Sequence, residues 1–254
     1  MRGTARLCDV EKRTVLNILK LAGANCERLL EQHVRNVRVS HLECDGIWGY
    51  VWCKQKNVKP TMEKPGECGD QYTYIALEET SKLVLAWHVG KRDRINTEDF
   101  ISKLRTATYA GTFDISTDAF QPYESAIDAG LYDRASHSNV LKLFSHHTEE
   151  GRERYSPAKF VAVQKDAVSG NPDLDRATTS HVERKNGTLR QWCKRLTRLT
   201  YAFSKKLANL KAALALHFAH YNLCRIHGSL QVTPAMAAGV TDRVWDISDL
   251  ISTL

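Results

Sequence analysis

Apolar and polar residues alternate along 42–52, which places Glu43 and Asp45 on the same side of an extended chain. A period of two is the pattern of a β-strand, so a strand is predicted there. Segments 72–77 and 83–89 predict two further strands. Because the links between these strands are short, the three are predicted to form an antiparallel meander.

The pattern then alternates between helix and strand. Segment 96–109 predicts an amphipathic helix capped by Thr97, followed by a strand at 112–116 and a helix at 123–131. Three strands, a helix, a strand and a helix predict an α/β fold, with a mixed sheet flanked by helices. The next stretch, about 132–178, is predicted to be an irregular insertion.

Beyond this insertion the chain is predicted to be helical. One helix is expected from Ser180 to about Leu196, and a longer apolar helix from Ser204 to about Cys224. The insertion itself contains only short strand candidates at 141–144 and 160–163.

The N-terminal segment 1–36 predicts a partial helix-turn-helix. Residues 6–20 have the pattern of a helix end, a turn at 8–10 and a second helix with Arg13 in its first turn. The second helix of such a motif enters the DNA major groove by its N-terminal residues, so Arg13 is a candidate DNA contact. A short turn between two connecting helices has the same pattern, and that alternative stays open.

Positive charge is concentrated near the C-terminus. The 254 residues carry a net charge of +7, and the segment from Arg184 to Thr241 contains no Asp or Glu. Arg190, Lys194 and Arg198 recur there at every fourth residue, so they are predicted to contact phosphates from one helical face. Such segregation is typical of a nucleic-acid-binding surface, whereas a merely solvated helix face usually carries both signs.

Several classes of protein are excluded by pattern. The longest apolar stretches, such as 212–216, fall far short of the roughly 20 residues that a membrane span needs. The opening residues lack a signal-peptide pattern and the seven cysteines include no CxxC pair, so a cytoplasmic protein with reduced thiols is expected. No glycine-rich phosphate loop occurs, so no nucleotide cofactor is expected.

Three carboxylates are candidate metal ligands. Asp45 lies within a predicted apolar strand, Asp118 lies just after another, and Glu183 starts the basic helix, on the same helical face as Asn186 and Arg190. If they converge, they could bind two Mg²⁺ ions, or Mn²⁺ in their place, for phosphoryl transfer. On spacing alone, ordinary surface charges and helix caps explain the three acids as well.

A second set of possible ligands lies in the last long helix. Its members are His217, His220, Cys224 and His227, at spacings of three, four and three that suit one helical side. The helix is apolar, so core or interface packing is favoured over a zinc site. The role of this set is left open.

Five segments carry a family resemblance. They are ECDGIWGYVWCKQKN (43–57), STDAFQPYESAI (116–127), RYSPAKF (154–160), the run 179–239 that begins TSHVERKNGTLRQW, and DRVWDISDLI (242–251). In order and placement they resemble transposases of the insertion-sequence-one type, which belong to the DDE superfamily with a ribonuclease-H-like fold. The resemblance implies a catalytic domain at 37–230 and a C-terminal extension at 231–254.

The resemblance also implies site residues. Asp45, Asp118 and Glu183 match the catalytic, metal-binding triad of that family. Gly46 and Ala119 depart from the family pattern, which commonly has an acidic residue and a glycine at these positions. Neither departure removes a proposed ligand.

The activity implied is Mg²⁺-dependent cleavage at the ends of an insertion sequence and strand transfer into target DNA. The implied partners are terminal inverted repeats, target DNA and further copies of the chain on the bacterial nucleoid, with Asn186 among the DNA contacts. Similar transposases begin with additional sequence. This leaves two alternatives: a catalytically silent, truncated DNA-binding fragment that regulates an intact transposase, and a general nuclease of the ribonuclease H type.

Overall fold

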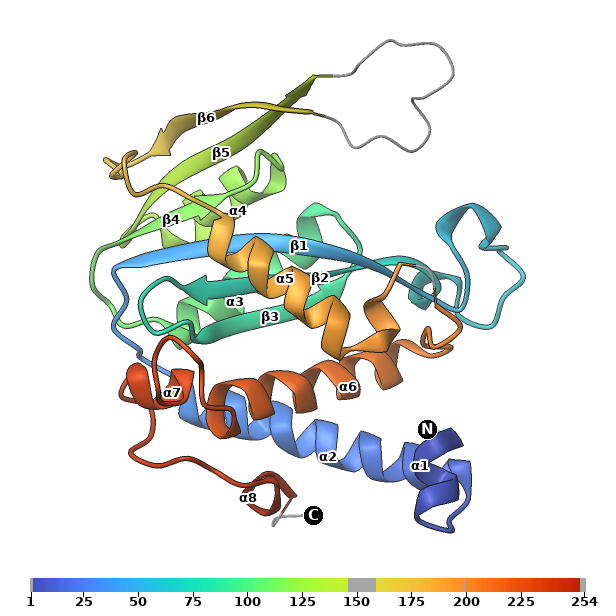
Figure 1. Ribbon diagram of the computed structural model, residues 1–254. Helices are drawn as coiled ribbons and strands as arrows, with labels where there is room; N and C mark the ends of the chain where they lie inside the picture. Colours follow the sequence, from blue (N-terminus) through green and yellow to red (C-terminus); the bar gives the residue numbers. More distant parts are fainter. Residues whose placement is uncertain (1, 146–158, 199, 252–254) are drawn as a thin grey trace.

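A computed structural model describes residues 2–145, 159–198 and 200–251 (Figure 1). A mixed sheet lies at its centre, with strand order β3-β2-β1-β4-β5-β6. The strands are β1 (His41–Val51), β2 (Gly69–Glu78), β3 (Val84–Gly90), β4 (Phe113–Thr117), β5 (Ala135–Ser145) and β6 (Lys159–Ser169). Strand β4 runs parallel to both β1 and β5, and the other neighbours are antiparallel. The predicted meander and mixed sheet are confirmed.

Helices flank this sheet, as predicted. They are α1 (Arg2–Leu7), α2 (Lys12–His33), α3 (Arg94–Ala107), α4 (Pro122–Leu131), α5 (Ser180–Trp192), α6 (Leu207–Ala219), α7 (Pro234–Ala237) and α8 (Ile247–Ile251). Helices α3 and α4 cover one face of the sheet and α5 crosses the other, while α2 and α6 lie side by side beyond β3 (Figure 1). No helix within the described ranges is long and apolar enough to cross a membrane.

The close approach of α2 and α6 depends on a glycine. A Cβ atom at Gly23 would lie 2.5 Å from the Cα atom of Ala212, closer than packed atoms come. Leu29 and Leu30 of α2 belong to the same hydrophobic core as residues of the sheet. Helix α2 therefore packs as part of the main body.

The structure does not show the predicted helix-turn-helix. Helix α1 has six residues, none of them buried, and α2 continues for 22 residues into the core. The predicted turn is present at residues 8–10, but α1 packs too little surface to form a compact pair with α2. Arg13 lies exposed in the first turn of α2.

The predicted cap of α3 is wrong by four residues. Asp93, and not Thr97, occupies the N-cap, and its side chain accepts a hydrogen bond from the backbone N–H of Asn96 at 2.9 Å. Thr97 is buried, and its hydroxyl donates to the carbonyl of Asp93 at 2.7 Å. Both residue types can cap a helix, and the tertiary position of Asp93 selects it here.

The segment predicted to be irregular holds two 11-residue strands, β5 and β6. The strand pattern of β5 was hidden because three of its five buried residues, His137, Ser138 and Asn139, are polar. Ser138 and His137 are buried and hydrogen-bond to the hydroxyls of Ser116 and Thr117 on the neighbouring strand β4, at 3.0 and 2.9 Å. Residues 146–158, which include most of the RYSPAKF segment, lie outside the described residues.

The two helices predicted after the insertion change type before their predicted ends near Leu196 and Cys224. Helix α5 ends at Trp192 because Cys193 leaves the helical conformation, and a short 3₁₀ turn (Lys194–Leu196) follows. Helix α6 ends at Ala219 and continues as a π-turn, η4 (His220–Cys224). Arg190, Lys194 and Arg198 therefore do not share one helical face.

Candidate functional site

The three candidate carboxylates line one cleft of about 690 Å³. Asp45 lies on β1, Asp118 directly follows β4, and Glu183 lies in the first turn of α5. Strands β1 and β4 are parallel neighbours with Cys44 opposite Thr117, and the residue that follows each of this pair in the chain is an aspartate. The sheet register and the crossing of α5 therefore bring together three acids that are far apart in the sequence.

Two hydrogen bonds orient Asp45. Its Oδ1 accepts from the backbone N–H of Gly46 and its Oδ2 accepts from the amide Nδ2 of Asn186, each at 2.7 Å. Burial raises the pKa of Asp45, and these two hydrogen bonds act in the opposite direction by stabilising the charged form. Asn186, predicted as a DNA contact, is buried and donates a hydrogen bond to Asp45.

Asp118 is paired with a cation that the sequence analysis did not identify. Its Oδ2 accepts from Nη2 of Arg92 at 2.8 Å, while its buried Oδ1 has no hydrogen-bond partner in the described part of the chain. Burial raises the pKa of Asp118 to about 6, and the neighbouring charge of Asp45 adds to this increase. A buried carboxylate oxygen without a partner is costly, and a bound cation would satisfy it.

Glu183 is held by two side chains. Its Oε1 accepts from the hydroxyl of Thr179 at 2.8 Å, and its Oε2 accepts from the ammonium group of Lys142 on β5. Lys142 was also missed from the sequence, since it lies in the segment predicted to be irregular. Both partners line the cleft with Glu183.

Hydrogen bonds join helix α5 to β1 near both ends of the helix. The fully buried carboxylate of Glu43 accepts from the backbone N–H groups of His181 and Val182, at 2.8 and 2.9 Å, and from Nδ1 of His181 at 2.5 Å. At the other end, Arg190 donates to the carbonyl of Trp48 at 3.0 Å. Glu43 and Asp45 are two residues apart and share one side of β1. One strand therefore carries the first acid and also holds the helix of the third.

The donor set of the cleft fits a hard divalent cation. Mg²⁺ and Mn²⁺ prefer carboxylate oxygens, and the cleft supplies three carboxylates, including the unpartnered Oδ1 of Asp118. Within the described ranges, no three His, Cys, Asp or Glu side chains are grouped closely enough to form a metal centre. Asp118 and Glu183 instead face Arg92 and Lys142.

Within the described ranges, the side chains of His217, His220, Cys224 and His227 are not grouped so that they could hold a metal ion. The change from α-helix to π-turn at His220 alters the pitch, so the spacing of these residues no longer places them on one side. Burial, and next the charge of Lys185, lowers the pKa of His217 to about 3, so its ring is neutral at physiological pH.

Lys185 is an unusual buried group beside this segment. It is 5% exposed, its ammonium group lies against the ring of Tyr221, and it has no hydrogen-bond partner in the described chain. Burial, with a smaller effect from Arg225, lowers its pKa to about 6. The amine is therefore largely uncharged at neutral pH.

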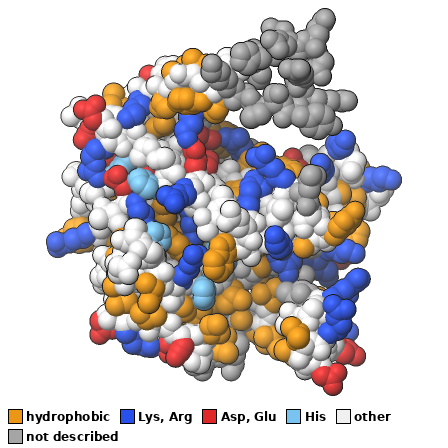
Figure 2. All heavy atoms as spheres, in the orientation of Figure 1, with side chains coloured by type: hydrophobic (Ala, Val, Ile, Leu, Met, Phe, Trp, Pro, Cys, Tyr) orange, Lys and Arg blue, Asp and Glu red, His pale blue; other side chains and the backbone are white. Residues whose placement is uncertain are grey.

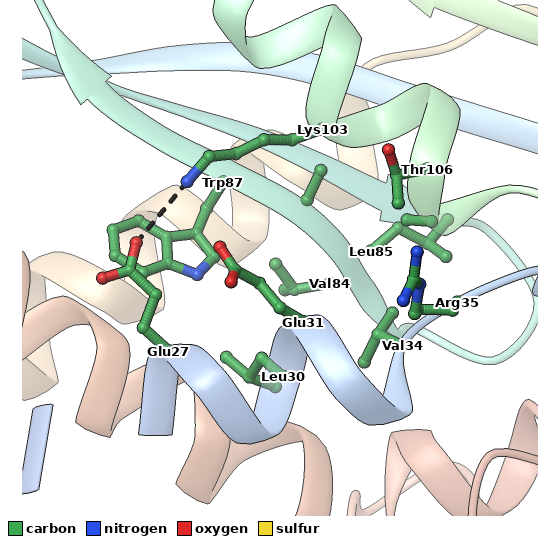
Figure 3. A pocket seen from close by; sticks show the side chains of 12 residues that line it. Glu27, Leu30, Glu31, Val34, Arg35, Val84, Leu85, Trp87, Lys103 and Thr106 are labelled. Carbon is green, nitrogen blue, oxygen red and sulfur yellow. Dashed lines mark hydrogen bonds and ion pairs between the residues drawn. The ribbon is translucent and has the colours of Figure 1, made fainter. Parts of the chain in front are cut away.

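A second cavity, of about 320 Å³, lies between α2, β3 and α3 (Figure 3). Val84, Leu85 and Trp87 of β3 give it an apolar wall, and an ion pair of 3.5 Å joins Glu27 and Lys103 across it. It brings together no set of acids comparable to the carboxylate cleft. The cleft is therefore the candidate site for chemistry.

The surface around the cleft is basic in part. Figure 2 shows Lys and Arg side chains gathered on the side of this face where α5 ends and α6 begins. Lys194 and Arg198 are exposed there, whereas the guanidinium of Arg190 donates to the carbonyls of Leu196 and Trp48. DNA contact by Lys194, Arg198 and Arg13 stays a prediction.

No family model matches the chain, and no curated protein matches it. The functional interpretation therefore rests on the geometry of the cleft and on the motifs in the sequence.

Proposed function

We propose that the chain is a DNA transposase of the insertion-sequence-one type with a ribonuclease-H-like fold. One observation carries the proposal: Asp45, Asp118 and Glu183, the residues that match the family triad, line a single cleft although they come from two strands and a helix. The strand order and the directions of β1, β4 and β5 are compatible with a ribonuclease-H-like sheet.

Asp45, Asp118 and Glu183 would hold two Mg²⁺ ions, or Mn²⁺ in their place. When bound, such ions activate the attacking oxygen and stabilise the leaving oxygen of an in-line phosphoryl transfer. In the proposed reaction, water first cuts at the ends of the element, and the freed 3′-hydroxyl then attacks target DNA.

The residues around the triad would keep its acids in place. Asn186 and the backbone N–H of Gly46 orient the Asp45 carboxylate, and Glu43 holds the first turn of α5, which carries Glu183. Such outer contacts reduce the rearrangement required during reaction. The exposed Lys194 and Arg198 would bind phosphates beside the cleft.

The proposal includes partners. Terminal inverted repeats and target DNA are the substrates, and two element ends handled together require more than one copy of the chain. We place the protein in the bacterial cytoplasm, associated with the nucleoid.

A nicking and strand-transfer assay with Mg²⁺ or Mn²⁺ tests the proposal. The substrate carries the terminal repeats of the element that encodes the chain, and wild type is compared with Asp118→Ala and Glu183→Ala. We expect the cleavage rate of both variants to fall on the order of 10³-fold or more, because each removes a ligand of the cations that stabilise the transition state. Asp128→Ala is the matched control, since Asp128 is an exposed acid on α4.

The outcomes separate the alternatives. End-specific cutting lost in both triad variants supports a transposase, and cutting without regard to ends supports a general nuclease. Binding of the ends without any cleavage by the wild type supports the regulatory DNA-binding fragment.

A further inference from the structure

Two basic side chains occupy the carboxylate cleft. Arg92 is paired with Asp118 at 2.8 Å, and Lys142 is paired with Glu183. All four side chains are partly exposed, and all line the same cleft as Asp45. The cleft therefore holds three acids and two bases from the chain itself.

Arg92 is fixed in orientation but has few partners. Its guanidinium lies over the ring of Phe120, 4.3 Å from the centroid, and also near the ring of Tyr72, at 5.4 Å. Among the described residues, the ion pair with Asp118 is its single side-chain hydrogen bond. An arginine has five N–H donors in a planar fork suited to phosphate, so most of its donors are available.

We propose that Arg92 and Lys142 bind the phosphodiester of the DNA substrate, and that Asp118 and Glu183 hold these two cations when the acids carry no divalent cation. The inference rests on the proposed function, because it assumes that DNA enters this cleft. Once a bound divalent cation or a substitution neutralises Asp118 and Glu183, Arg92 and Lys142 lose their anionic partners. Their charges then face the cleft unpaired. Asp118 and Glu183 would then control both catalysis and the affinity for DNA.

The proposal predicts coupling that can be measured without metal. Asp118→Asn neutralises the acid in nearly the same shape and should release Arg92. Each additional phosphate contact steepens the dependence of log affinity on log salt by about 0.9 and raises affinity about eightfold at 0.1 M salt. Removal of any acid near DNA also raises affinity by general electrostatics, so the single variant alone does not decide the question.

A double-mutant cycle isolates the effect of Asp118 on DNA binding by Arg92. Binding of a fluorescently labelled duplex that carries the element end is measured in EDTA over a range of salt concentrations. We expect Arg92→Gln to change the slope little in the wild type, where the charge is held by Asp118. In the Asp118→Asn background it should reduce the slope by about 0.9. Glu183→Gln with Lys142→Gln is a second, independent cycle, should one pair of variants fail to fold.

Asp128→Asn combined with Arg92→Gln is the matched control, and its effects should be additive, since Asp128 is an exposed acid on α4 and the ion pair of Arg92 is with Asp118. Additive slopes in both test cycles would overturn the proposal, while metal-dependent cleavage by the wild type would leave the proposed function intact. If the wild type does not bind DNA and does not cleave it, the inference and the proposed function both fail.

Discussion

The two buried sides of α5 differ in how far their buried polar groups are hydrogen-bonded. Toward β1, Glu43 is fully buried and accepts three hydrogen bonds. The amide Nδ2 of Asn186 and the guanidinium of Arg190 also donate hydrogen bonds there, although the buried Oδ1 of Asn186 has no partner in the described chain. Toward α6 and η4, Lys185 is almost as buried and has no hydrogen-bond partner in the described chain. Burial of a polar group is tolerated where hydrogen bonds replace water, and it is costly elsewhere. The partnered side carries Glu183, so hydrogen bonding is concentrated where position matters for the proposed chemistry.

Glu43→Ala should give the largest change in the free energy of unfolding, because it removes the hydrogen-bond acceptor on the side of α5 that faces β1. Two backbone N–H groups and the ring of His181 would lose their partner. We expect a loss of about 3 kcal/mol in the free energy of unfolding, measured by urea denaturation. Glu43→Gln keeps an acceptor and should cost about 1 kcal/mol. Glu31→Ala, at an exposed position of α2, is the control; an equal effect of both alanine variants would contradict this role for Glu43.

Lys185→Met should stabilise the protein, in contrast to Glu43→Ala. Methionine fills a similar space without a polar group to desolvate, so we expect the free energy of unfolding at pH 7 to rise by about 2 kcal/mol. Lys185→Gln, which keeps a buried polar group, is the comparison and should gain less. A loss of stability in Lys185→Met would show that the ammonium group has a stabilising partner.

The pH dependence of stability provides a second test of Lys185. Its folded pKa of about 6 lies below its value in the unfolded chain, so the unfolded state binds more protons between these two values. This group therefore makes the wild type more stable as pH rises from about 6 toward 10. The stability difference between Lys185→Met and wild type should shrink over that range, as measured by urea unfolding at several pH values. A constant difference would contradict the lowered pKa.

Asn186→Ala should have the smallest effect of these variants, and mainly on activity. The variant removes the hydrogen bond that favours the charged form of Asp45, so the pKa of Asp45 should rise. We expect cleavage to fall roughly tenfold, with the larger loss at acidic pH, in a pH–rate profile. Asn17→Ala, at an exposed position of α2, should leave the profile unchanged.

Local patterns predicted most of the sheet and the helices α3 to α6. The alternation at β1 and the apolar spacing of α3 depend on neighbours in sequence, so they can be recognised without tertiary information. The gaps have a common cause. Strand β5 was predicted only at 141–144, because the polar residues buried at its start are hydrogen-bonded by β4. The helix, turn and helix expected near the N-terminus are present, but the sequence does not show that α2 packs on α6.

By itself, the sequence determined the residue types of the candidate site, the concentration of positive charge after Arg184 and the order of the elements up to α4. Only the tertiary structure decided which cations face the acids. Arg92 lies in the link after β3 and Lys142 on β5, and neither position has a local signal that relates it to Asp118 or Glu183. Contacts between residues far apart in the chain are set by strand order and helix crossing, which a pattern of neighbouring residues does not encode.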